Sequence, residues 1–161
     1  MNLQGWRITT LVTCLIVVGL LFNFGLAGWN APAIHQAIDA TGRSSLILFA
    51  IAFTSSCFES LWPSSLSRWT LRNRRWIGLS FASSHFIHLG LIISMTVFFP
   101  DPFVRDQSMA QWVFGGLAYG FVLLMAITST DPAQRWMGMK TWKRLHFVGS
   151  HWIWVLFLLT Y

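Results

Sequence analysis

The sequence carries little charge. Only 10% of its 161 residues are charged, just 5 are acidic, and 55% are hydrophobic. In a soluble globular domain roughly a quarter of the residues are charged. The composition therefore excludes an ordinary soluble domain and indicates a membrane protein.

Cysteine is also scarce. The chain has two cysteines, Cys14 and Cys57, which lie in separate apolar segments without the spacing of a metal site. We expect both to be small, buried hydrophobic residues. They indicate neither a metal centre nor a particular redox compartment.

Long apolar runs occupy most of the chain. A bilayer core about 30 Å thick requires about 20 apolar residues per helix. We expect five membrane-spanning helices: Thr9–Trp29, Ser45–Trp62, Trp76–Phe99, Gln111–Thr130 and Lys143–Tyr161. The fold class predicted is all-α, a polytopic membrane helix bundle, with residues 1–161 forming a single transmembrane domain. The short connections leave no room for a soluble flavin, nucleotide or protease module.

The positive charges alternate between the ends of these segments. The net charge is +6, and most basic residues fall at the N-terminus, between the second and third segments, or between the fourth and fifth: Arg7, Arg68, Arg72, Arg74, Arg75, Arg135, Lys140, Lys143 and Arg144. The opposite connections hold only Arg43 and Arg105, beside three aspartates. The positive-inside rule places the N-terminus in the cytoplasm and the C-terminus outside. The basic clusters thus indicate topology and contact with lipid headgroups, with no need for a nucleic-acid partner.

Three features of the connections and helices lead to structural expectations. His35 lies in a loop that we expect to end at Thr41-Gly42-Arg43, and residues 63–75 read as a polar, basic connection before the third span. In the fourth segment, Gly116 and Gly120 form a small-xxx-small pattern, which predicts close helix packing.

Four of the five histidines fall on the third and fifth segments, which run in the same direction in the predicted topology. An unsatisfied imidazole in hydrocarbon is costly, and ionisable residues inside membranes are functional candidates. Haem iron bound axially by imidazole from both sides would satisfy histidines on both helices. His85 and His88, three residues apart, share roughly one helix face. His146 and His151 are about 140° apart around their helix and cannot bind the same iron.

Two arguments about the ligand on the fifth segment disagree. Gly149 and Ser150 share the face of His146 and would let a porphyrin approach the backbone, which favours His146. However, His88 lies about 18 Å along its helix from Trp76, whereas His146 follows directly after the basic residues. The two depths agree if the fifth helix begins before those residues, or if the connection before the third segment is partly helical. The alternative ligands that reduce the mismatch are His85 and His151.

Three motifs in order carry a family resemblance: Arg74-Arg75-x-x-Gly-Leu followed by His88, then Ala126-Ile-Thr-Ser-Thr130, then Trp142-x-Arg-Leu-His146. From about residue 41 to 151 the chain resembles the ferric reductase-like transmembrane domain family. Within it, the closest type is the bacterial haem-binding subunit that passes quinol electrons to a periplasmic protein-methionine-sulfoxide reductase. The resemblance implies that His88 and His146 are the axial ligands of haem b in a multi-pass protein of the bacterial inner (cytoplasmic) membrane.

We therefore expect a b-type cytochrome that relays electrons, from quinol as implied by the resemblance, through a bis-histidine haem to a partner protein. Such a chain is an electron-transfer subunit of an oxidoreductase rather than a complete enzyme. Arg74, Arg75 and Arg144 are candidates to neutralise the haem propionates near the cytoplasmic side.

Two departures from the family pattern support a different hypothesis. Leu159 stands where members often have a further histidine, and no sixth helix precedes the end at Tyr161. The alternative function is a structural or accessory subunit of a larger membrane complex, in which haem is lost or not used. A metal transporter is less favoured, because no carboxylates accompany the histidines at membrane depth.

Overall fold

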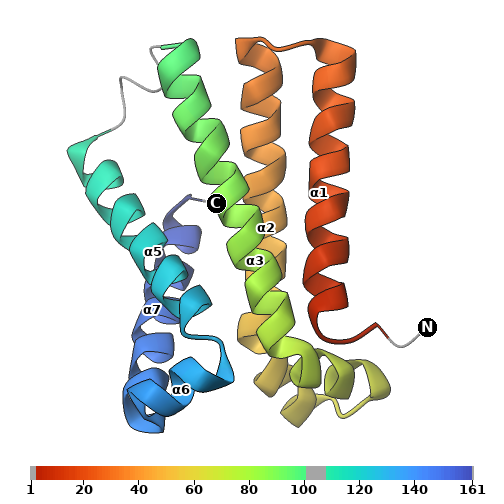
Figure 1. Cartoon of the computed structure of the whole chain (residues 1–161), viewed down its shortest axis with the longest axis vertical. Coiled ribbons are helices and arrows are strands. Elements are labelled where there is room, and N and C mark those ends of the chain that lie inside the picture. The colour runs from red at the N-terminus through yellow and green to blue at the C-terminus, as the bar shows by residue number, and fades with distance from the viewer. Residues whose placement is uncertain (1–2, 101–107, 161) are drawn as a thin grey trace. The chain divides into compact units, whose positions relative to one another are not determined.

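The computed structural model describes residues 3–100 and 108–160, and all its regular elements in that part are helices. The helices are α1 (Trp6–Ala27), α2 (Ala31–Leu61), α3 (Ser65–Phe98), α5 (Met109–Ile127), α6 (Asp131–Met137) and α7 (Met139–Thr160) (Figure 1). They form two compact units, Met1–Arg105 and Asp106–Tyr161. The predicted all-α, polytopic membrane fold is confirmed. The connection that carries Arg105 lies outside the described residues.

Four of the described helices, α1, α2, α3 and α5, are long and apolar enough to cross a membrane. Their length and composition place the chain in contact with lipid. The fifth predicted segment also forms a helix, the 22-residue α7, but α7 is not among the four candidate spans. Its first turns carry Lys140, Lys143 and Arg144, and the charge of these side chains lowers its mean hydropathy. Membrane crossing by α7 stays a prediction.

Helix α2 begins much earlier than its apolar run. The Asn30 side chain caps it by accepting a hydrogen bond from the Ala33 amide at 2.9 Å, and Pro32 sits in the first turn. The prediction of a loop that carries His35 and ends at residues 41–43 is therefore wrong, because these residues are helical. The apolar run marks the part of α2 suited to hydrocarbon, whereas the polar cap sets where the helix starts.

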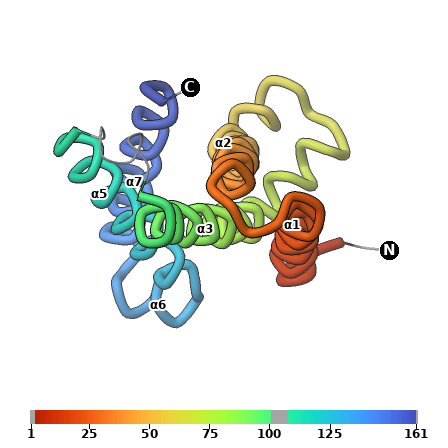
Figure 2. The backbone as a smooth tube through the Cα atoms, turned by 90° about the horizontal axis from the view of Figure 1, so that it is seen from above, coloured from red at the N-terminus to blue at the C-terminus, as the bar shows by residue number. Residues whose placement is uncertain are grey.

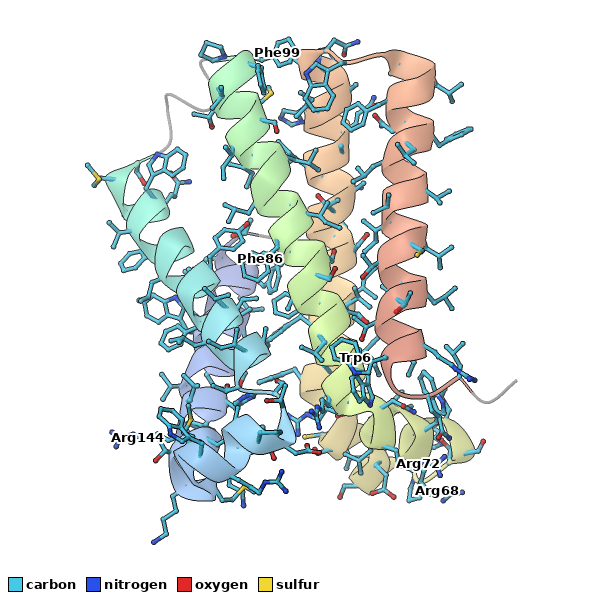
Figure 3. All side chains as sticks on the ribbon, in the orientation of Figure 1. Trp6, Arg68, Arg72, Phe86, Phe99 and Arg144 are labelled. Carbon is cyan, nitrogen blue, oxygen red and sulfur yellow. The ribbon has the colours of Figure 1, made fainter. Side chains whose placement is uncertain are left out.

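Helix α3 also begins before its apolar run. Ser64 and Ser67 form a capping box, in which each side chain bonds the backbone amide of the other. Residues 65–75, expected as a polar connection, are therefore helical. The helix starts proposed for matching the histidine depths are found, since α3 extends back to Ser65 and α7 starts at Met139. The depth match itself stays a prediction. Arg68 and Arg72 lie at the end of the first unit opposite Phe99 (Figure 3), as the predicted topology requires.

In the first unit, α3 is tilted against α1 and α2 and lies beside both (Figure 2). Its contact with α2 is the most extensive, while α1 packs mainly on α3 and less on α2. Polar contacts fix α1: Thr9 Oγ1 donates to the Trp76 carbonyl at 3.1 Å, and the hydroxyls of Thr13 and Ser83 lie 2.9 Å apart. Both cysteines are exposed, so their predicted burial is wrong.

In the second unit, α5 and α7 pack as an antiparallel pair. A Cβ built on Gly149 would lie 2.6 Å from Met125 Sδ and 3.2 Å from Phe121 Cδ1, so the bare backbone of α7 accommodates α5. The prediction that a porphyrin could approach the backbone at Gly149 is therefore wrong, because side chains of α5 fill that space. A Cβ on Gly116 or Gly120 would meet no atom of the described residues within 4 Å. The close packing expected from these two glycines is not found.

Candidate functional site

A row of buried polar contacts joins α2 to α3. On α3, Ser84 and His88 are four residues apart and share one face. The facing residues of α2 are Ile38, Thr41 and Ser45, whose spacing also places them on one face. The hydroxyls of Ser45 and Ser84 lie 2.9 Å apart, and both residues are fully buried. This pair keeps the two helices in register next to His88.

Contacts with Ile38 and Thr41 determine which nitrogen of His88 carries the proton. His88 Nδ1 lies 3.0 Å from the Ile38 carbonyl oxygen and 3.1 Å from Thr41 Oγ1. Because the Thr41 hydroxyl donates its own proton to the Ala37 carbonyl at 2.7 Å, Thr41 Oγ1 faces His88 as an acceptor. Two acceptors at Nδ1 assign the proton to that nitrogen. Nε2 then keeps its lone pair, which is the arrangement of a metal-binding imidazole.

His85 supports the ring of His88. The two imidazoles stack with centroids 5.6 Å apart and an interplanar angle of 16°, and His85 also contacts the Phe81 ring at 5.3 Å. Nearer the basic end of α3, the guanidinium carbon of Arg75 lies 5.1 Å from the centre of the Trp76 ring. The structure thus brings His85 and His88 together and leaves Arg75 more than three helical turns from His88.

The second unit brings together the other two motifs. Trp142 Nε1 donates to the Thr128 carbonyl at 3.0 Å, and the Trp142 ring lies 4.1 Å from the His146 ring. His146 Nε2 lies 3.5 Å from Thr128 Oγ1, at the outer limit of a hydrogen bond. Because the Thr128 hydroxyl already donates to the Leu124 carbonyl at 2.6 Å, this contact is weak. A metal ligand bond can replace it at little cost.

His151 is also arranged so that its Nε2 could bind a metal. Its Nδ1 lies 2.7 Å from the Phe147 carbonyl oxygen, and its ring contacts the Phe147 ring at 4.1 Å. A carbonyl can only accept, so Nδ1 holds the proton and Nε2 keeps its lone pair. His151 is exposed, as is Arg144. The chemistry of the imidazole therefore keeps His151 as an alternative to His146.

His88 and His146 each carry an imidazole that haem iron could take as a ligand. Within residues 3–100 and 108–160, no group of three or more histidine, cysteine, aspartate or glutamate residues is placed to hold a metal. Haem would need only one or two imidazoles from the protein, because the porphyrin would supply the other iron ligands. His88, with Nδ1 bonded and Nε2 carrying a lone pair, fits that requirement. His146 lies in the other unit and fits it less tightly, through a contact that is easily exchanged.

Sequence reasoning missed the residues of α2 that orient His88. Thr41 was expected in a loop, and Ile38 was not considered because it contributes only a backbone carbonyl. A signal was present: Ile38, Thr41 and Ser45 recur at the three- and four-residue spacing of one helix face. Recognising Asn30-Ala-Pro32 as a helix start would have extended α2 across this face.

Comparison with known families identifies the chain. The family described as ferric reductase like transmembrane component matches residues 40–160. No curated protein and no solved structure matches the chain. The matched region holds all three motifs and four of the five histidines. Members of this family generally bind haem. The chain therefore belongs to the ferric reductase-like transmembrane family, which indicates a function in membrane electron transfer.

Proposed function

We propose that this protein is a b-type cytochrome of the bacterial inner membrane. It takes electrons from quinol and relays them through a bis-histidine haem to a partner protein, as in the haem-binding subunit of the periplasmic protein-methionine-sulfoxide reductase. The observation that carries this proposal is the geometry of His88, whose Nδ1 is bonded by α2 while Nε2 keeps its lone pair.

His88, on the first unit, and His146, on the second, are the proposed axial ligands. Haem b, when bound, supplies the one-electron redox chemistry. The protein orients His88 through Ile38 and Thr41, and the Trp142 ring packs against His146. Arg75 and Arg144 are the proposed partners of the propionates. A guanidinium bonds a carboxylate in a fixed, planar geometry.

The proposed donor and acceptor follow from what the chain can hold. Its described helices are suited to a bilayer, and lipid-soluble quinol is the reductant available in that phase. The family resemblance supports the same donor. The proposed acceptor is a separate protein, as the family resemblance implies.

An absorption spectrum of the purified full chain tests the proposal. A b-type reduced-minus-oxidised signal is expected, with pyridine-haemochrome analysis giving the number of haems per chain. His88→Ala and His146→Ala should lose the signal, whereas the matched variants His85→Ala and His151→Ala should retain it. Retention in His146→Ala with loss in His151→Ala would move the second ligand to His151.

A colourless but stably folded protein would contradict the cytochrome proposal. That result would favour the second candidate, a structural or accessory subunit of a larger membrane complex. Leu159, at a position where family members often have histidine, is the residue that supports this candidate.

A further inference from the structure

A groove runs between α1 and α2. These helices contact each other less than either contacts α3, and the space left between them has a volume of about 470 Å³. This volume lies in the range of small-molecule sites, about 300–1,000 Å³. One stretch of the groove is apolar and includes Val12, Leu15 and Leu48. Another is lined by polar residues, Asn23, Thr41 and Ser44.

Asn23 is the polar residue that α1 contributes to this groove. Across residues 3–100 and 108–160, no hydrogen bond satisfies its buried Oδ1 atom. An unsatisfied amide oxygen in an apolar helix is costly, which marks the residue as a functional candidate. The Ser44 hydroxyl, on the α2 wall, donates to the Ala40 carbonyl at 2.7 Å and keeps lone pairs to accept a hydrogen bond.

The lining selects the chemistry of the occupant. The groove has no charged side chain among its lining residues, so it offers nothing to balance a phosphate. An uncharged ring with hydroxyl or carbonyl groups matches the polar end, and an apolar tail matches the rest. An amide both donates and accepts, so Asn23 suits a ring in either its hydroxyl or its carbonyl form. An isoprenoid quinol has each of these features.

We propose that this groove binds a quinol, with the ring hydrogen-bonded to Asn23 and Ser44 and the tail lying along the apolar stretch. The proposal rests on the function proposed above, since it names the site of the electron donor. Thr41 lines the groove and its Oγ1 also lies 3.1 Å from His88 Nδ1. The ring site is therefore separated from the proposed iron ligand by one side chain. The α1 wall precedes residue 40, where the family match begins.

Calorimetric titration of the full chain in detergent micelles with decylubiquinone tests the site, with empty micelles as the blank. Gly19 lines the groove, and a Cβ there meets no atom of the described residues within 4 Å, so Gly19→Leu adds a side chain to the groove at an unobstructed position. We expect Gly19→Leu and Asn23→Leu each to weaken decylubiquinone binding about tenfold. Asn23→Leu removes roughly one buried hydrogen bond, and Gly19→Leu removes a comparable amount of packing contact with the ligand. Gly25→Leu is the matched control, because its Cβ is equally unobstructed but lies outside the groove.

Binding that persists in Gly19→Leu, or that falls equally in Gly25→Leu, would overturn the proposal. Unchanged binding in Asn23→Leu would overturn the placement of the ring. If an excess of phosphatidylglycerol displaces decylubiquinone, the groove is an acyl-chain site and the proposal fails. Haem absorbance of the same samples separates the two proposals: a colourless chain that binds decylubiquinone refutes the cytochrome alone, and a haem-loaded chain that does not bind it refutes the groove alone.

Discussion

Nδ1 of His88 lies 3.1 Å from Oγ1 of Thr41, and the Thr41 hydroxyl directs its own proton to the carbonyl of Ala37. The direction of the second bond determines the role of the first, because a hydroxyl that has donated its proton can only accept from the imidazole. A threonine on α2 thus controls which face of a histidine on α3 is available to a ligand.

Thr41→Val should weaken haem binding about tenfold. Removing the hydrogen-bond partner of a ligating histidine typically weakens binding about 10–100-fold, and we expect the lower end because the Ile38 carbonyl still accepts from Nδ1. The haem midpoint potential should rise, since a weaker bond at Nδ1 makes the imidazole a poorer donor to ferric iron. Haem retention during dilution and a redox titration measure the two effects. Thr41→Ser, which keeps the hydroxyl, should behave as the wild type. Equal behaviour of the Val and Ser variants would exclude the proposed role.

The buried hydroxyls of Ser45 and Ser84 should be energetically coupled. Hydrogen bonds between membrane helices contribute about 0.6 kcal/mol on average and up to roughly 1.7 kcal/mol. A double-mutant cycle with Ser45→Ala and Ser84→Ala, read as the free energy of unfolding in mixed micelles, should give a coupling in this range. Additive effects of the two substitutions would show that their 2.9 Å contact does not stabilise the α2–α3 pair.

Gly149→Leu should destabilise the second unit by about 1–3 kcal/mol, as expected for overpacking. A side chain at this position must displace Met125 and Phe121. Gly116→Leu is the matched control, because a Cβ there meets no described atom within 4 Å. Thermal unfolding of both variants gives the comparison, and equal transition temperatures would contradict the packing of α5 on Gly149.

The orientation of the C-terminus tests whether α7 crosses the membrane. Five spans with a cytoplasmic N-terminus place the C-terminus outside. A C-terminal alkaline phosphatase fusion, which is active only outside the cytoplasm, should therefore be active, and an N-terminal green fluorescent protein fusion should be fluorescent. An inactive phosphatase with a fluorescent N-terminal fusion would indicate that only the four more apolar helices cross.

The membrane-helix class and the family were both predictable from the sequence, because long apolar runs and ordered motifs are local features. The helix ends were harder to predict from the sequence. Asn30 and the Ser64–Ser67 capping box add polar turns to α2 and α3 that hydropathy does not detect. The extra turns of α2 carry Thr41, so a misplaced helix start also concealed the hydroxyl that orients His88.

Packing partners were harder still to predict. Gly116, Gly120 and Gly149 are chemically identical, yet only Gly149 accommodates a neighbouring side chain. Which glycine does so depends on the rotation of α7 against α5, and that rotation is settled by many contacts between residues distant in sequence. The ligand roles of His88 and His146 remain predictions that the haem spectra will decide.

The residues that orient His88 have a consequence for biosynthesis. Ile38 and Thr41 lie on α2, and His88 lies on the helix that follows it, so both of these contacts at Nδ1 come from chain made no later than α3. Domains generally fold in the order of their synthesis, N-terminal first. The first imidazole can therefore reach its final tautomer while α5, α6 and α7 are still being translated. Haem loading that requires His146 would then wait for the last helix, which makes cofactor insertion a late step in assembly.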